Sequence, residues 1–262
     1  MVQAWLHRSG HCPLSIYCEE LCCIEDEMLE VLARHRARWE HVRLDILPTR
    51  LPLLKGPMPL LRKLEIQVAT NGDINLTFSE VPQLTSVTLW DFRYPTGLIP
   101  WSQLTSLILI YNGSHQYTPV LKQTFNLVHC ELILGDEEEI PETDIHLPRL
   151  ECLTIAPYYV HSDPLSTGFL QSFIVPALCR LQVPETFLAP DPIAELMAFI
   201  PKSQCTLKEL RITGERSLSR YSYRKAFPSI PDITFSKRRD WISGADEKPG
   251  KLGRSMSDFE YE

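Results

Sequence analysis

The sequence has little glycine, 11 residues in 262, and it lacks the glycine-rich loops that hold phosphate groups. Neither G-x-G-x-x-G nor G-x-x-x-x-G-K-[ST] occurs, which argues against a dinucleotide-binding fold and against a P-loop nucleotide hydrolase. Long apolar runs are also missing. The longest candidate, residues 188–200, is broken by prolines and acidic side chains, whereas a membrane span needs roughly 18 unbroken apolar residues. We therefore expect no membrane partner.

Positive charge is in short supply. Lysine and arginine number 26 against 33 aspartates and glutamates, so the net charge is −7. A chain with this balance is not expected to bind nucleic acid or anionic lipid through a net positive field. Eight cysteines are too few for a disulfide scaffold of this length, and the N-terminus lacks the apolar core of a signal peptide. We expect a cytoplasmic or nuclear protein with no nucleic-acid partner.

A repeat runs through most of the chain. Its pattern is L-x-x-L-x-L with conservative replacements, and Leu61, Leu64 and Ile66 form a typical copy. The middle apolar residues of the successive copies are Leu14 (in a partial first copy), Val42, Leu64, Val87, Leu107, Cys130, Leu153, Leu181, Leu210 and Ile233. Nine steps from residue 14 to residue 233 give a period of about 24 residues, and leucine-rich repeats have periods of roughly 20–29 residues.

The pattern predicts a fold as well as a period. Alternating apolar residues of one copy point to one face of a short strand, and stacked neighbours bury that face in a continuous core. The sequence therefore predicts an α/β fold, an irregular leucine-rich-repeat solenoid (horseshoe) with one parallel sheet and variable short helices or loops on the convex side. The irregularity is expected because the asparagine common after the last core position occurs only at Asn112. The alternative is a sandwich of unrelated buried strands.

The solenoid is expected to occupy residues 1–236, where the repeat stops. Residues 237–262 have mixed charge and few aliphatic side chains, which predicts a disordered C-terminal tail. Helices are predicted over residues 25–39 and 193–199, and shorter helical segments over 119–125 and 167–173. Asp191 is expected to cap the helix over 193–199, with Pro192 at its first position.

Three segments have a family resemblance. They are the opening WLHRSGHCPLSI (residues 5–16), the copy LPRLECLTI (147–155) and the stretch IPKSQCTLKELRI (200–212). These segments resemble the leucine-rich-repeat region of fungal F-box-like proteins. In that family the repeats follow a helical F-box, which binds a Skp-type adaptor of a cullin ubiquitin ligase, and the repeats select the protein to be ubiquitinated.

The resemblance implies a non-enzymatic protein-interaction module, similar to the substrate-recognition repeats of an F-box protein. Nothing before Trp5 is long enough to be an F-box. Ligase recruitment is therefore carried over to no residue of this chain, and a Skp-type adaptor is an expected partner only if an upstream F-box exists. The alternative is a stand-alone scaffold protein of the same fold, with no link to ubiquitin.

Strand alternation also predicts a binding surface. The residues that flank each middle position lie on the concave sheet face, and most of them are polar. The exceptions form an apolar patch across three adjacent strands: Trp90, Ile108, Ile110 and Ile133. Exposed apolar patches with tryptophan mark partner sites, so we predict a protein ligand there. The alternative is that these side chains pack under a loop or under the C-terminal tail.

Side chains that could carry chemistry have simpler explanations. The first 23 residues hold several metal-ligand types, namely His7, His11, Cys12, Cys18, Cys22 and Cys23. Their spacing lacks the C-x-x-C pairs typical of zinc sites, and alternation over residues 13–18 predicts a capping strand. The other cysteines at or beside repeat positions, Cys130, Cys152 and Cys179, are expected to be buried hydrophobes rather than nucleophiles.

An acidic run over residues 136–144 is expected to be a solvated loop rather than a catalytic or cation site. No arrangement of a nucleophile, a base and a group that stabilises charge is recognisable. We therefore expect no enzyme, no catalytic residue, no cofactor and no metal ion.

Overall fold

The computed structural model describes residues 2–18, 26–68, 78, 80–90, 99–111, 113–135, 141, 143–158 and 168–236. The strands of the large sheet are β1 (Leu14–Cys18), β2 (Trp39–Ile46), β3 (Lys63–Val68), β4 (Ser86–Trp90), β5 (Ser106–Ile110), β6 (His129–Leu134), β8 (Cys152–Pro157), β10 (Arg180–Pro184), β11 (Glu209–Thr213) and β12 (Asp232–Ser236). Two short strands, β7 (Ile145–His146) and β9 (Phe173–Ile174), pair separately.

Helices and turns of helix connect the strands. The α-helices are α1 (Val2–Arg8), α2 (Asp26–Ala33), α3 (Ser114–Leu121), α4 (Pro192–Ser203) and α5 (Arg220–Ala226). The 3₁₀ segments are η1 (Arg36–Arg38), η2 (Pro48–Leu54), η3 (Trp101–Gln103), η4 (Phe169–Ser172) and η5 (Glu185–Leu188). Parallel strands need such crossovers, because the chain must return to the edge of the sheet where the previous strand began before it can start the next one.

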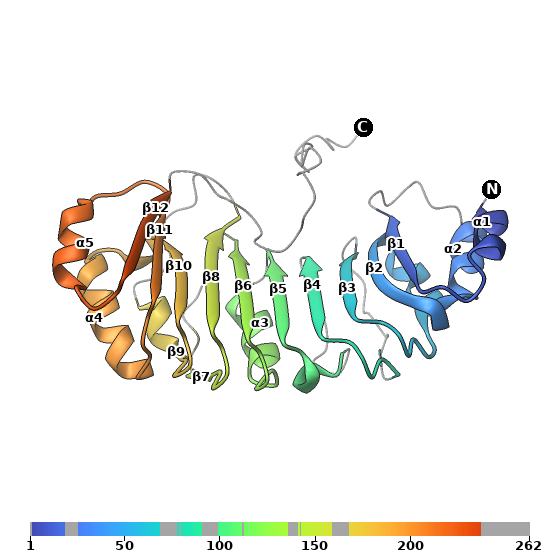
Figure 1. Ribbon diagram of the computed structural model, residues 1–262, viewed down its shortest axis with the longest axis horizontal. Coiled ribbons are helices and arrows are strands. Elements are labelled where there is room, and N and C mark those ends of the chain that lie inside the picture. The colour runs from blue at the N-terminus through green and yellow to red at the C-terminus, as the bar shows by residue number, and fades with distance from the viewer. Residues whose placement is uncertain are drawn as a thin grey trace.

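The architecture is α/β with one large parallel sheet, as predicted, rather than two sheets of a sandwich. The ten strands of that sheet follow the chain order, and every pairing in it is parallel. Figure 1 shows them side by side along a curved row, with their arrowheads at the same edge. The helices α1 and α2 lie at one end of the row, and α4 and α5 lie at the other.

The predicted middle positions lie beside one another in the sheet. This register runs without a break through Val42, Leu64, Val87, Leu107, Cys130, Leu153, Leu181, Leu210 and Ile233. The first copy corrects the prediction: Ile16, not Leu14, pairs with Val42. Leu14 pairs with Trp39, because the register shifts between Leu14 and Ser15.

The core follows directly from the repeat. The first apolar positions of five consecutive copies have no exposed surface: Leu61, Leu84, Leu104, Leu127 and Leu150. Each copy alone would leave this face in water, so the burial comes from its neighbours. The result is one hydrophobic cluster that runs from Leu6 to Ile233.

Side chains other than asparagine donate hydrogen bonds to backbone carbonyls in the connections between copies. The side-chain amide of Gln103 donates to the carbonyls of Val81 at 2.7 Å and Leu84 at 2.8 Å. One side chain of the following copy thus satisfies two carbonyls of the preceding connection. Such bonds meet the requirement that buried backbone groups be paired.

Arg38 holds the opening segment of the chain. Its guanidinium donates to the carbonyl of Cys12 at 3.0 Å and to Oγ of Ser9 at 2.7 Å. Both acceptors belong to the opening that carries the family resemblance. A planar guanidinium with several donors suits this arrangement, because it can reach two acceptors at once.

The helix predictions are confirmed in part. The helix expected over residues 25–39 is shorter, since α2 ends at Ala33 and η1 follows. The Asp191 side chain accepts from the amide of Ala194 at 3.0 Å, so it caps α4 as predicted. The segment over 119–125 lies earlier, in α3, and the one over 167–173 is the 3₁₀ turn η4. The helices α1 and α5 and the β7–β9 pair were not predicted.

None of the helices in the described ranges has the length and apolarity that a bilayer crossing requires. The tail predicted over residues 237–262 lies outside the described residues.

Candidate protein-binding face

The two faces of the large sheet differ in composition. One face carries the hydrophobic core, and the opposite face, called the polar face below, carries the residues that flank each middle position. Its central row, one residue after the middle position, consists of Tyr17, Arg43, Glu65, Thr88, Ile108, Glu131, Thr154, Gln182, Arg211 and Thr234. Its carboxyl-end row, two residues further on, consists of Asp45, Gln67, Trp90, Ile110, Ile133, Ala156, Pro184, Thr213 and Ser236.

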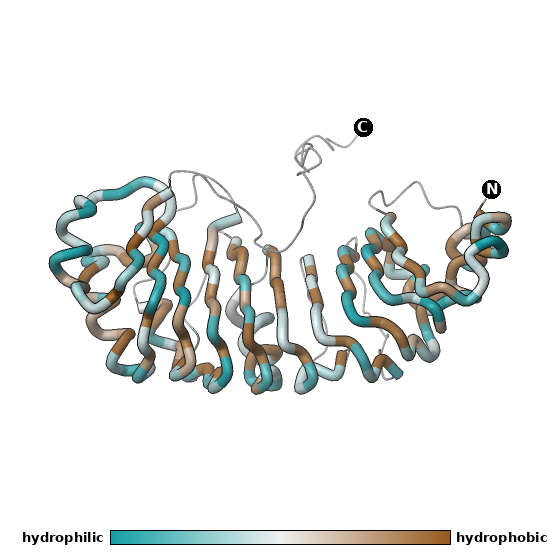
Figure 2. Tube along the Cα trace, viewed as in Figure 1, coloured by the Kyte–Doolittle hydropathy of each residue, from teal (hydrophilic) through white to brown (hydrophobic). Residues whose placement is uncertain are grey.

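All four residues of the predicted patch lie on the polar face. Trp90 pairs with Ile110, and Ile110 pairs with Ile133, in the carboxyl-end row. Ile108 lies in the central row of β5. Figure 2 shows β5 as hydrophobic along nearly its whole length, in the middle of the sheet.

Their exposure corrects the predicted patch. Trp90 and Ile108 are half-buried, whereas Ile110 is 6% exposed and Ile133 is 2% exposed. Of the four predicted residues, Trp90 and Ile108 are therefore the two that leave apolar surface accessible on this face. The binding role of these residues stays a prediction.

The burial of the two isoleucines continues along the same row into the next three strands of the sheet, β8, β10 and β11. Ala156, Pro184 and Thr213 of the same row are buried as well. At this edge the rings of Tyr111 and Tyr158 pack together with centroids 4.9 Å apart. Tyr111 has a φ of 58°, a conformation that bulky residues seldom adopt.

Gly135 makes room for this aromatic pair. It follows β6, which lies between β5 and β8. A Cβ atom on Gly135 would lie 3.3 Å from Cε2 of Tyr111. The absence of a side chain there lets the Tyr111 ring lie close to the backbone that follows β6.

The acid in the central row of β3 is neutralised by its neighbours. Glu65 lies 2.6 Å from Nζ of Lys63 and 3.7 Å from Nε of Arg43. Arg62 and Glu40 form a further pair at 3.3 Å beside it. Glu65 therefore has positively charged neighbours on its own strand and on β2. Each such partly exposed pair adds little stability.

The acid in the central row of β6 has no such neighbour. Glu131 is half-buried between Ile108 of β5 and Thr154 of β8. Burial raises the pKa of its carboxyl, and burial is the sole cause. Among the described residues, no hydrogen bond or ion pair engages this carboxylate.

No protein-family model, curated protein or solved structure matches this chain. The resemblance to F-box-like repeats therefore stays an expectation from the sequence motifs.

Cys130 and Cys152, two of the cysteines in the described ranges, have thiols that are hard to ionise. Burial raises the pKa of the Cys130 thiol, which lies in the core. Burial also raises the pKa of the Cys152 thiol, and neighbouring Arg180 offsets only part of the effect. Both are thiols rather than thiolates near neutral pH, and the thiolate is the nucleophile.

Metal-binding side chains are not gathered in the described ranges. There, no three histidine, cysteine, aspartate or glutamate side chains are close enough to hold an ion. Cys22, Cys23 and most of the acidic run lie outside the described residues. Asp144, the last residue of that run, pairs with Nζ of Lys202 at 2.9 Å.

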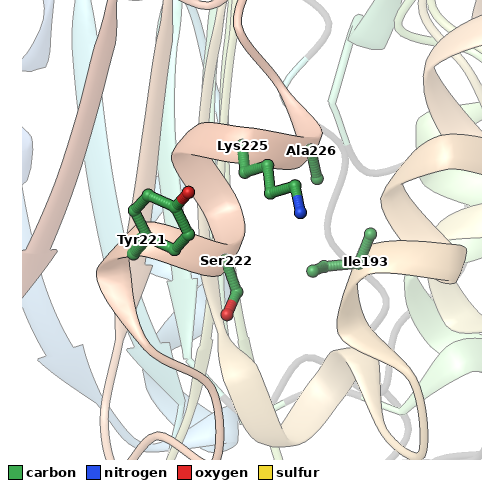
Figure 3. A pocket seen from close by; sticks show the side chains of 5 residues that line it. All are labelled: Ile193, Tyr221, Ser222, Lys225 and Ala226. Atoms are coloured by element: carbon green, nitrogen blue, oxygen red, sulfur yellow. The ribbon is translucent and has the colours of Figure 1, made fainter.

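A shallow groove of about 420 Å³ lies between α4 and α5. It is lined by Ile193 of α4 and by Tyr221, Ser222, Lys225 and Ala226 of α5 (Figure 3). The Lys225 side chain extends across it toward Ile193 (Figure 3). Sequence reasoning missed this groove because it did not predict α5, whose one fully buried side chain is Tyr223.

Glu185 is a buried carboxylate with a structural explanation. It is 4% exposed. One oxygen, Oε1, accepts from Oγ of Ser217 at 2.7 Å and from the amides of Ser217 and Leu218. The other, Oε2, accepts from the hydroxyl of Tyr223 at 2.9 Å. With both oxygens occupied, Glu185 has little capacity left for a ligand and instead joins η5 to α5.

Proposed function

We propose that the chain is a leucine-rich-repeat solenoid that binds a protein through the polar face of its sheet, without chemistry of its own. The repeat period and the in-register core support the solenoid assignment. The observation that carries the binding role is the pair Trp90 and Ile108, which stay half-buried in the middle of a polar, regularly spaced surface. Tryptophan is enriched among the residues that dominate interface energies.

The dimensions of the face suit a macromolecule. Strands in a sheet lie about 4.8 Å apart, so ten strands extend over roughly 40 Å. Parallel rows of side chains over that length offer many separate contacts. Repeat proteins use extended surfaces of this kind to bind other proteins.

Photo-crosslinking tests this proposal. The residue p-benzoylphenylalanine is placed at position 108 of the full chain in one variant and at position 125 in another. Phe125 is 53% exposed and lies in the turn after α3. We expect a specific protein adduct from position 108 and none from position 125. Equal adducts from both positions would contradict binding through the polar face.

The resemblance to F-box-like repeats supports a more specific role, the selection of substrates for a cullin ubiquitin ligase. The alternative is a scaffold that uses the same face without a ligase. The two roles differ in one partner, the Skp-type adaptor. Co-purification of the full chain with such an adaptor would support the ligase role, and clean separation of the two proteins would support the scaffold.

A further inference from the structure

Glu131 occupies the middle of the polar face. It belongs to β6, and its neighbours in the central row are Ile108 and Thr154. Along its own strand, the next residues on this face are His129, which is exposed, and Ile133, which is buried. The carboxylate thus borders apolar surface on two sides.

The carboxylate lacks the compensation that Glu65 has. Lys63 and Arg43 neutralise Glu65, but no charged group contributes to the raised pKa of Glu131. A carboxylate that is partly removed from water without a partner raises the free energy of the folded state. A cation supplied from outside would offset part of that cost on binding.

The surroundings favour a long basic side chain over a small ion. Lysine and arginine lay their aliphatic stems along apolar surface while the charged group stays at its edge. Ile108 offers such a surface directly beside Glu131. Trp90 lies one strand beyond Ile108, and the face of an indole attracts cations.

We infer that the bound protein places a lysine or arginine side chain across Ile108, with its charged group on the carboxylate of Glu131. This inference rests on the proposed function, since it names the chemistry of the partner at the same face. The net charge of −7 agrees with it, because a negative chain attracts a basic partner at long range.

Selection of peptides from a random phage-displayed library tests the inference. The full chain, the Glu131→Gln variant and the Glu65→Gln variant are each used as bait. We expect lysine or arginine at one fixed position of the peptides selected on the wild-type chain and on Glu65→Gln. The Glu131→Gln variant is expected to select peptides without that preference, because an amide offers no charge to pair with.

The best wild-type peptide then provides a quantitative test. Replacing its basic residue by norleucine removes the charge and keeps the stem. We expect about a tenfold loss of affinity or more from this change, and a similar loss from Glu131→Gln. Because both changes remove the same pair, combining them should cost little beyond either change alone.

The outcomes separate the inference from the proposed function. Peptides that depend on Trp90 but bind Glu131→Gln as tightly as wild type would overturn the inference and leave the binding face intact. Failure to select any peptide that depends on Trp90 would count against the proposed function itself.

A basic segment of the same chain, Lys237-Arg238-Arg239, is the competing occupant. Replacing these three residues by glutamine would raise the affinity for peptides if the segment already paired with Glu131. If the affinity rose in this way, and the peptides selected on the wild-type chain showed no preference for lysine or arginine, the cation would belong to this chain. That result would overturn the inference.

Discussion

The hydroxyl of Tyr223 donates a 2.9 Å hydrogen bond to Oε2 of Glu185, which lies 38 positions earlier in the chain. This bond joins α5 to the 3₁₀ turn η5 that follows β10. Burial raises the pKa of the tyrosine, and the carboxylate beside it adds to the effect. The hydroxyl is therefore protonated and available as a donor near neutral pH, and the bond anchors α5 to η5.

Loss of this anchor should destabilise the protein. Tyr223→Phe leaves Oε2 of Glu185 buried without a donor, so we expect a loss of about 1–3 kcal/mol in the free energy of unfolding. Urea denaturation measures it. The control is Tyr221→Phe, because Tyr221 is 74% exposed, and it should change stability by less than about 0.5 kcal/mol. Equal effects from both substitutions would rule out the anchor.

Substitutions in the predicted patch should show which side chains stabilise the fold and which contribute to binding. Ile133→Ala removes a buried side chain and should cost about 2–4 kcal/mol of stability. Ile108→Ala, on the same face but half-buried, should cost much less and should weaken the partner captured by crosslinking. Urea denaturation and a binding titration measure the two effects. Similar losses of stability from both variants would show that Ile108 also belongs to the core.

Trp90→Ala should weaken the same partner most. A hot-spot tryptophan contributes about 2 kcal/mol or more, which corresponds to roughly a 30-fold loss of affinity. The circular dichroism spectrum and the melting temperature should remain close to wild type, since Trp90 is half-buried. A folded Trp90→Ala protein that binds its partner normally would remove Trp90 from the binding face.

The stability of the chain should carry a pH dependence from Glu131. Its pKa in the folded state lies above the ordinary value of 4.5, so the folded state binds the proton more tightly than the unfolded state. This favourable contribution is complete below about pH 4.5 and is lost as the pH rises through the folded-state pKa. The nearest titratable group on the same strand face is His129.

Comparison with Glu131→Gln isolates that contribution. Relative to wild type, the variant should gain stability between pH 4 and pH 7.5, as measured by urea denaturation at both values. Glu65→Gln is the matched control, because it breaks contacts with Lys63 and Arg43 instead. It should lower stability by at most about 1 kcal/mol at pH 7.5. A wild-type chain that gains stability relative to Glu131→Gln over this range would contradict the prediction.

Side chains at position 135 should disturb the aromatic pair. Gly135→Ala brings a Cβ within 3.3 Å of the Tyr111 ring, a contact that a small shift relieves. Gly135→Val places two further methyl groups on that Cβ and should lower the free energy of unfolding by about 1–3 kcal/mol. Near-ultraviolet circular dichroism reports the tyrosine environment and should change more for valine than for alanine. Unchanged spectra in both variants would place the rings elsewhere.

The order of the strands could be predicted because its signal is local. Each copy carries its own apolar residues. A middle residue such as Leu107 is therefore buried beside the middle residues of the adjacent copies, Val87 and Cys130. The error at Leu14 has a physical cause as well. Alternation alone does not reveal the register shift after that residue.

Elements stabilised by distant contacts could not be predicted in this way. Helix α5 has no apolar stripe, and it depends on the cap that Ser219 provides to the amide of Ser222 and on the bond from Tyr223 to Glu185. The groove beside Ile193 exists because of that helix. Its residues were therefore missed together.

Local alternation of apolar residues was sufficient to establish the strands of the large sheet, their period and the face on which Trp90, Ile108, Ile110 and Ile133 lie. It was not sufficient to establish which of these side chains solvent reaches, because Ile108 and Ile110 have the same alternation and differ in burial. Nor did it distinguish Glu65 from Glu131, two acids at equivalent positions of the repeat. That difference arises from side chains on adjacent strands, and those strands become neighbours only when the chain folds.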